Sequence, residues 1–145
     1  MYKHILIATD GSAAAEKAVD QGLALAKALA AEATAITVTE PWAAMVSREM
    51  AVAFPVDDYE RSVAAHARLI LDGVAQRAAD RGVVCETLHV RDEYPAEGII
   101  NTAKERGCDL VVVASHGRRG LARLLLGSQT HKVVSLSGVS VLVCR

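Results

Sequence analysis

The sequence predicts an α/β fold, a single five-stranded parallel sheet sandwiched by four helices, and two observations support this class. Short apolar runs alternate with longer segments of helical periodicity along the 145 residues. The runs are apolar at successive positions, which is typical of strands that are buried on both faces. Strands separated by helices are expected to be parallel, and right-handed crossovers then bring ligand sites to the carboxyl edge of the sheet, where the strand order reverses.

The first part of the chain contains two expected strands and the first helix. His4–Thr9 is a short apolar run that ends in the turn Asp10-Gly11-Ser12, in which Ser12 is a candidate helix N-cap. Ala35–Thr39 is predicted as the second strand, and Pro41–Pro55 as an irregular segment. The first helix is indicated by small and apolar residues at helical spacing, namely Ala15, Ala18, Gly22, Leu25 and Leu29.

A second helix is expected directly after the irregular segment. Asp57 and Asp58 lie where carboxylates favour a helix N-terminus, and Gly82 is a suitable C′ residue at its end. The apolar stripe between them consists of Val63, Ala67, Ile70, Val74 and Ala78.

The remaining elements follow in the second half. Pro95 suits the first turn of a helix because its missing N–H has no intrahelical partner there, and Gly107 ends that helix. The other expected elements are the strand Val83–Val90, the strand Leu110–Ala114, the helix Ser128–Leu136 and the strand Val139–Cys144.

Length, charge and cysteine content restrict the function classes. The length fits one domain that spans 1–145, and a formal net charge of −1 argues against a dedicated nucleic-acid surface, which is usually strongly basic. No stretch approaches the ~18 apolar residues of a membrane span, and the first apolar run is too short for a signal peptide. Cys85, Cys108 and Cys144 lack CxxC spacing and are interpreted as reduced core thiols. We therefore expect a cytoplasmic protein without nucleic-acid or membrane partners.

The most informative segment follows the strand Leu110–Ala114. Ser115-His116-Gly117 comes directly after this strand, and Gly127-Ser128 comes further along, with arginines at 118, 119 and 123 between them. Unpaired backbone N–H groups at a helix N-terminus, exposed by glycines and flanked by cations, make a phosphate site. The segment has neither the spacing of a Walker loop nor a GxGxxG after the first strand.

The chain resembles the universal stress protein family in five segments: ILIATDGS, TVTEP, YPAEGIINTAKERGCDLVVVASHGRRG, LLLGSQTHKVV and VSVLVCR. Nucleotide-binding members carry a glycine, two residues, a glycine, nine residues and Gly-Ser or Gly-Thr. Gly117 and Gly127-Ser128 match the second and third elements, whereas Ala114 stands in place of the first glycine. The resemblance covers the whole chain. It implies a Rossmann-like fold similar to that of adenine-nucleotide alpha-hydrolases, usually dimeric and often through the last strand.

For a bound ATP or AMP, the resemblance implies contacts from the strand ends and the last helix. Thr9 and Asp10 are among them, with Asp10 near the base and ribose, and Val38 would supply a backbone contact that reads adenine. The ribose and first phosphates would be lined by Ala114, His116 and Gly117, with Arg118 as the best placed arginine. The contacts at the last helix would be Gly127, Ser128, Gln129 and Thr130, of which Gly127, Ser128 and Thr130 would hold the outer phosphates. Mg²⁺ would be held through the phosphates.

Several of these residues also have a structural interpretation. Gly117 and Gly127 could be turn and cap glycines that need a positive φ. Ser128 could cap the last helix, and Asp10 could serve only to order the turn into the first helix. The alanine at 114 costs little if strand geometry continues to that residue.

The histidines predict neither catalysis nor a metal site. His116 lies beside the glycine loop, but acid–base work needs a positioned partner, so an ordering role in the loop is favoured. His66 and His131 lack the spacing of metal ligands. No catalytic residue is predicted.

Three functions stay open, in decreasing order of support. The first is an adenine-nucleotide-binding protein with a sensing or regulatory role in the stress response, which is not an enzyme. Ala114 favours the second, a dimeric interaction module of the same fold that has lost its nucleotide. The third is weak ATP hydrolysis or adenylation. Enzymes of this kind need a glycine-rich phosphate loop after the first strand, and this chain has only the sequence TDGS there. A homodimer through Val139–Cys144 is expected because a short apolar terminal strand has an edge that needs cover.

Overall fold

The computed structural model describes residues 1–117 and 126–145 and contains one five-stranded parallel sheet. The strands lie in the order β3-β2-β1-β4-β5, so the direction of winding reverses between β1 and β4. Every neighbouring pair is parallel. The strand bounds are β1 His4–Ala8, β2 Glu32–Thr39, β3 Cys85–Arg91, β4 Leu110–Ala114 and β5 Ser140–Cys144. The predicted fold class is therefore confirmed.

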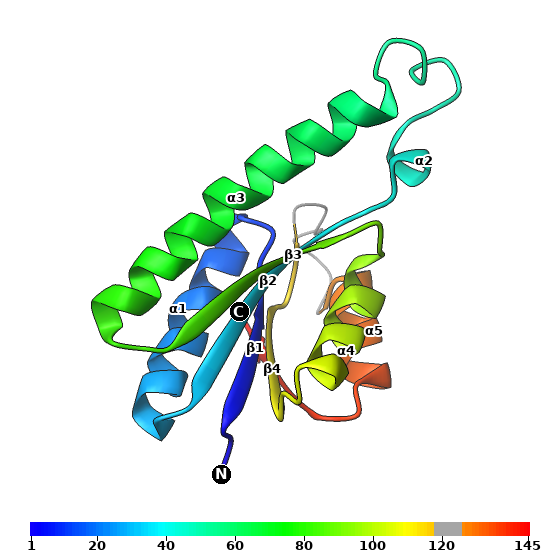
Figure 1. Cartoon of the computed structure of the whole chain (residues 1–145). Helices are drawn as coiled ribbons and strands as arrows, with labels where there is room; N and C mark the ends of the chain where they lie inside the picture. Colours follow the sequence, from blue (N-terminus) through cyan, green and yellow to red (C-terminus); the bar gives the residue numbers. More distant parts are fainter. Residues whose placement is uncertain (118–125) are drawn as a thin grey trace.

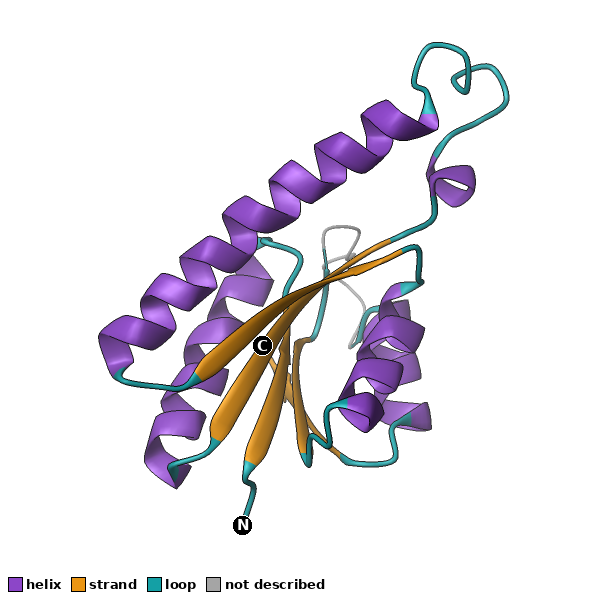
Figure 2. Cartoon of the chain, in the orientation of Figure 1, coloured by secondary structure: helices purple, strands orange, loops and turns teal. Residues whose placement is uncertain are grey.

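Helices cover both faces of this sheet (Figures 1 and 2). α1 and α3 pack on one face around a core that includes Ile7, Val19 and Leu23. α4 and α5 pack on the other face around Leu6, Ile36 and further apolar side chains. The helix bounds are α1 Ala13–Leu29, α2 Trp42–Met45, α3 Val56–Arg81, α4 Pro95–Glu105 and α5 Ser128–Leu136.

The helix ends follow the expected local chemistry. The Ser12 hydroxyl accepts from the N–H of Ala15 at 3.2 Å, which confirms Ser12 as the N-cap of α1. Gly82 and Gly107 have φ of +70° and +65°, as expected for glycines that end α3 and α4. Ser12 thus fixes where α1 begins, and the two glycines fix where α3 and α4 end and the chain turns back to the sheet.

Four strand predictions were wrong in their bounds, the first and the last of them by one residue, since β1 ends at Ala8 and β5 begins at Ser140. β2 begins at Glu32 and not at Ala35, because it pairs with β1 from Glu32 and with β3 from Ala33. β3 begins at Cys85 and not at Val83, because the N–H of Val83 donates to Ala78 and completes the end of α3. Pairing with neighbours, rather than hydrophobicity, sets these ends.

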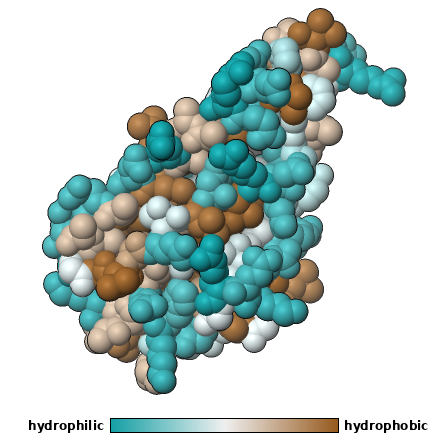
Figure 3. Space-filling view, viewed as in Figure 1, coloured by the Kyte–Doolittle hydropathy of each residue, from teal (hydrophilic) through white to brown (hydrophobic). Residues whose placement is uncertain are grey.

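The segment Pro41–Pro55 is not irregular throughout, as it was predicted to be. It contains the short helix α2, which is an addition to the four helices that cover the sheet. The Trp42 indole donates to the Phe54 carbonyl at 2.9 Å, and the Tyr59 hydroxyl donates to that of Glu40 at 2.6 Å. This segment and the start of α3 form an arm that projects beyond the sheet (Figure 1), and hydrophobic residues are exposed at its tip (Figure 3).

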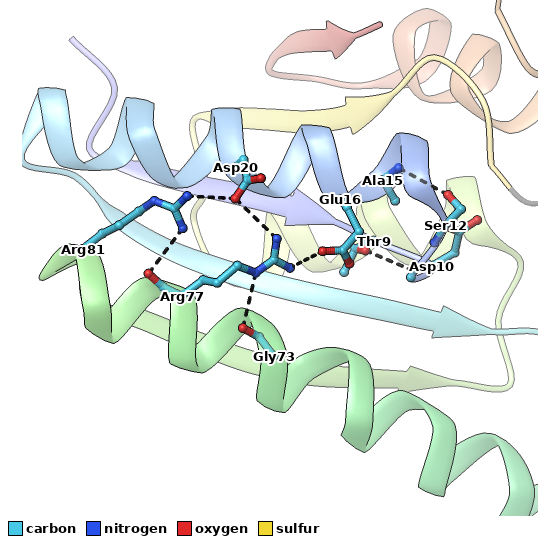
Figure 4. Close-up of polar contacts among 10 residues, drawn as sticks. Thr9, Asp10, Ser12, Ala15, Glu16, Asp20, Gly73, Arg77 and Arg81 are labelled. Carbon is cyan, nitrogen blue, oxygen red and sulfur yellow. Dashed lines mark hydrogen bonds and ion pairs between the residues drawn. The ribbon is translucent and has the colours of Figure 1, made fainter.

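Ion pairs fix α3 against α1 (Figure 4). The Arg77 guanidinium lies 2.6 Å from Glu16 and 3.4 Å from Asp20, and Arg81 lies 2.9 Å from Asp20. All four side chains are partly exposed, so each pair stabilises the fold by less than about 1 kcal/mol. Their main effect is on the position of α3, which forms one wall of the site described below.

We expect Asp109→Asn to destabilise the fold at neutral pH. The Asp109 carboxylate accepts from the backbone N–H groups of Lys3 and His4 at 2.9–3.1 Å, which joins the start of β1 to the start of β4. Burial acts to raise the pKa of Asp109, but these N–H donors outweigh it and hold the pKa below its usual range. The charged carboxylate should contribute about 1 kcal/mol.

The sign of the pH dependence follows from this lowered pKa. The contribution of Asp109 is complete above the pKa of the unfolded chain and is lost as pH falls through the lower folded value. Urea unfolding should therefore separate Asp109→Asn from wild type at neutral pH, with the two converging in acid. An equal loss at both pH values, or the same loss in the exposed control Glu49→Gln, would contradict this assignment.

The cysteines should resist thiol reagents in the folded protein. All three are free, Cys108 and Cys144 are buried, and Cys85 is half-buried. Burial raises the pKa of Cys108 to about 11 and also raises the pKa of the other two thiols. Because the thiolate is the reactive form, a disulfide reagent should modify Cys85 slowly, and Cys108 and Cys144 only on unfolding. Mass spectrometry of timed samples would show the order, and fast native labelling of Cys108 would refute it.

Candidate functional site

A pocket of about 630 Å³ opens at the carboxyl edge of the sheet, where the strand order reverses. It is bordered by the ends of β1, β2 and β4, the starts of α4 and α5, and one side of α3. Arg118 lies outside the described residues. The predicted residues that line the pocket are Thr9, Asp10, Val38, Ala114, His116, Gly117, Gly127, Ser128, Gln129 and Thr130.

The end of β1 is held in place by hydrogen bonds from its neighbours. The N–H of Thr9 donates to Ile36 at 2.9 Å, and the Thr37 hydroxyl donates to the Thr9 carbonyl at 2.9 Å. One carboxylate oxygen of Asp10 accepts from the N–H of Ser12 at 2.9 Å. Asp10 therefore does order the turn into α1, while its side chain also lines the pocket.

Strand geometry continues to Ala114, the position at which the family motif has glycine. Ala114 pairs with Cys144 at the end of β4, and its φ is not positive. Its methyl group belongs to the core that lies against α1, and its carbonyl accepts from the Thr130 hydroxyl at 2.8 Å. The alanine therefore causes no backbone strain at this point.

Gly117 and Gly127 are not explained by a positive φ, since among the residues that the structure describes the glycines with positive φ are Gly11, Gly82 and Gly107. Instead, neighbouring atoms leave little room for a side chain at either glycine. A Cβ on Gly117 would lie 2.9 Å from a carboxylate oxygen of Asp10, and one on Gly127 would lie 3.3 Å from the Ser115 carbonyl. Both glycines thus permit close approach of the chain at the pocket.

The start of α5 corrects one prediction. Gly127, and not Ser128, is the N-cap residue, because its carbonyl accepts from the N–H of His131 at 2.9 Å. No side chain of the described residues caps this helix, and the N–H of Gly127 donates to the Ser115 carbonyl at 2.7 Å. By helical geometry, the N–H groups of Ser128, Gln129 and Thr130 have no intrahelical acceptor. They carry the partial positive charge of the helix N-terminus into the pocket region.

Side chains around α5 fix its position. The Gln129 side-chain oxygen accepts from the N–H of Ala96 at 3.1 Å, which ties α5 to the first turn of α4. The Thr130 hydroxyl, which donates a hydrogen bond to the Ala114 carbonyl, ties the first turn of α5 to β4. The Ser115 hydroxyl and the His116 Nδ1 lie 3.0 Å apart, a contact of the kind expected from the ordering role that was favoured for His116.

Comparison with known proteins adds to this geometry. The sequence profile described as Universal stress protein family matches residues 1–145. The chain belongs to the universal stress protein family. Universal stress protein YxiE of Bacillus subtilis is 36% identical over 149 residues, and the match covers 100% of each chain.

Solved structures of similar proteins share the fold of this universal stress protein. The structure of hypothetical protein MJ0577 of Methanocaldococcus jannaschii has a TM-score of 0.83 at 29% identity and covers 99% of this chain and 96% of its own. A universal stress protein crystallised in complex with cAMP has a TM-score of 0.73 at 28% identity and covers 99% of this chain and 97% of its own.

Sequence reasoning missed the α3 side of the pocket in this family member. Tyr59, Val63, His66 and Ile70 of α3 line this side, together with Met45 of the short helix α2. Val63 and Ile70 had been recognised as part of the apolar stripe of α3, but such a stripe is the usual signature of a core-facing helix. The packing of α3 relative to the strand ends decides which stripe residues border the pocket.

The part of the chain that the structure describes contains no group of three or more His, Cys, Asp or Glu side chains placed to hold a metal ion. In the same residues, no helix is long and apolar enough to cross a membrane. The chemistry of the pocket is instead that of backbone N–H groups, small residues and two carboxylates, Asp10 and Glu40.

Proposed function

We propose that the pocket binds an adenine nucleotide, and that the protein acts as a cytoplasmic sensor or regulator in the stress response. The observation that carries the proposal is the position of the α5 N-terminus at the reversal point of the sheet, with Gly117 and Gly127 against the pocket. The similar protein crystallised with cAMP supports an adenine nucleotide as the ligand.

The residues present fit such a ligand. The N–H groups of Ser128, Gln129 and Thr130 would receive the outer phosphates, as helix N-termini commonly do. The Thr130 hydroxyl is already used by Ala114, so Thr130 would contribute its N–H. Mg²⁺ would accompany the phosphates, because divalent magnesium is commonly bound through phosphates and few protein ligands.

The ends of β1 and β2 in the pocket suit the nucleoside. Asp10 would accept from ribose hydroxyls, a role for which a carboxylate is better suited than for contact with a phosphate. Val38 lies near the end of β2, with its side chain directed at α4, where a Cβ on Gly98 would come within 2.9 Å of it. Its backbone would read adenine, and Thr9, Ala114, His116, Gly117 and Arg118 would complete the contacts.

Titration calorimetry with AMP, ATP and cAMP tests this function. We expect saturable binding of at least one of them at millimolar concentration or below, at one nucleotide per chain. Wild-type protein, freed of carried-over nucleotide by unfolding and refolding, is the sample. No saturable binding of any of the three would refute the function and favour the interaction module. Turnover of ATP above background would instead support the hydrolytic alternative.

We also propose a homodimer through Val139–Cys144. β5 is an edge strand of the sheet, with Leu142 exposed on it and Leu136 exposed at the end of α5. A dimer that pairs two such strands would remove the open edge. Light scattering should give twice the chain mass for wild type and a single chain mass for Leu142→Lys. A wild-type monomer at high concentration would refute this assembly.

A further inference from the structure

A second hollow, here called the arginine hollow, lies between α3 and the edge strand β3. Its volume is about 560 Å³, and it shares no lining residue with the pocket at the carboxyl edge. Arg61 and Arg68, two helical turns apart on one face of α3, line it together with Arg91 at the end of β3. Figure 3 shows that the surface over α3 is mostly hydrophilic in this view.

The positive charge in this hollow is only partly balanced by ion pairs. Arg61 forms an ion pair with Asp58. Within residues 1–117 and 126–145, neither Arg68 nor Arg91 pairs with a carboxylate, although Asp72 lines the same hollow one turn from Arg68. With Arg61 paired to Asp58, the lining presents two further guanidinium groups, those of Arg68 and Arg91, against the one carboxylate of Asp72.

A chain of hydrogen bonds through His89 to Thr39 holds the Arg91 side chain in place. Its Nε donates to Nδ1 of His89 at 3.3 Å, so the proton of the imidazole is on Nε2, which donates to the Thr39 hydroxyl at 2.8 Å. Burial and the charge of Arg91 lower the pKa of His89, against an opposing effect of Glu60, and the neutral ring can therefore accept from Arg91. The Nε of Arg91 is thus engaged with the protein, while its two terminal nitrogens make no hydrogen bond to the described residues.

We propose that the arginine hollow binds a small anion of the phosphate class, separate from the nucleotide site. Guanidinium groups match phosphate oxygens with parallel N–H donors, and Arg91 is already oriented for such a contact. Ala64, Ala65 and the buried Leu71 supply the apolar part of the lining beside these arginines. The ligand would be a phosphorylated metabolite or an inorganic oligophosphate, held between α3 and β3.

Pyrophosphate is the probe that tests this site, titrated without Mg²⁺ into uniformly labelled protein and followed by amide NMR shifts. We expect saturable shifts at Thr87, His89 and Arg91, weaker at higher salt. Arg91→Gln and Arg68→Gln should each weaken pyrophosphate binding by about tenfold or more, because each removes charge-assisted hydrogen bonds. Both residues are exposed, so these variants should fold normally.

Arg106→Gln is the matched control, since Arg106 pairs with Glu86 of β3 outside the hollow and the change in charge is the same. It should leave pyrophosphate affinity within about twofold of wild type. An equal loss in Arg106→Gln would show general charge attraction and overturn the proposal. Shifts confined to 126–130 would place the anion at α5 and overturn it as well, as would the absence of saturation. Added AMP should not compete with pyrophosphate for the hollow.

Discussion

Replacing Gly117 by valine should weaken adenine-nucleotide binding by about 10- to 100-fold, corresponding to a steric cost typical of overpacking. A Cβ at this position would lie 2.9 Å from a carboxylate oxygen of Asp10, closer than van der Waals contact allows. Either the carboxylate or the backbone at 117 must move, and both line the pocket. Residue 117 is exposed, so the change should leave the free energy of unfolding nearly unaltered. Calorimetric titration with AMP, beside a thermal melt, measures both quantities.

Gly138→Val provides the matched control, because nothing lies within 4 Å of a Cβ at Gly138 and its φ is not positive. Its affinity for AMP should equal that of wild type. A double-mutant cycle with Asp10→Ala then tests the mechanism. If crowding of Asp10 is the cause, Gly117→Val should cost much less in the Asp10→Ala background. Wild-type affinity in Gly117→Val would contradict the placement of the nucleotide beside this glycine.

The sequence predicts some elements to the residue and others poorly, for physical reasons. β4 and α5 have the predicted bounds, since a fully apolar run and a glycine before Ser128 mark them clearly. α2 was missed because a helix of four residues has little periodicity to detect. Its conformation depends on a long-range contact between Trp42 and Phe54. Tertiary contacts of this kind leave no local pattern.

The candidate site shows the same division. Residues next to strand ends could be assigned to the pocket because parallel strands bring their carboxyl ends to one edge. The cap at Ser128 was wrong, because Gly127 is held to Ser115 across the loop and takes the N-cap position. The α3 wall was missed because packing, and not sequence spacing, determines which side of that helix meets the strand ends.

The second large effect is expected at Gly22, where α1 packs against the centre of β1. A Cβ on Gly22 would lie 2.7 Å from Cδ1 and 2.8 Å from Cγ1 of Ile7, whose side chain is fully buried. Ile7 cannot rotate away without disturbing the core between the sheet and α1. We therefore expect Gly22→Leu to lower the free energy of unfolding by about 3 kcal/mol and the melting temperature by roughly 10 °C.

Leucine in place of Gly73 should instead raise the free energy of unfolding. Gly73 lies in α3 with nothing within 4 Å of an added Cβ, so leucine there gains helix propensity of about 0.8 kcal/mol and causes no clash. Urea unfolding of Gly22→Leu and Gly73→Leu compares an identical change in side chain on two helices of one protein. Equal shifts in both would show that helix propensity dominates and that contact with Ile7 does not require glycine. Opposite shifts would show that the distance between α1 and β1 is set by the absence of a side chain at residue 22. That distance also positions Asp10, which lines the pocket, since Asp10 lies in the turn that joins these two elements.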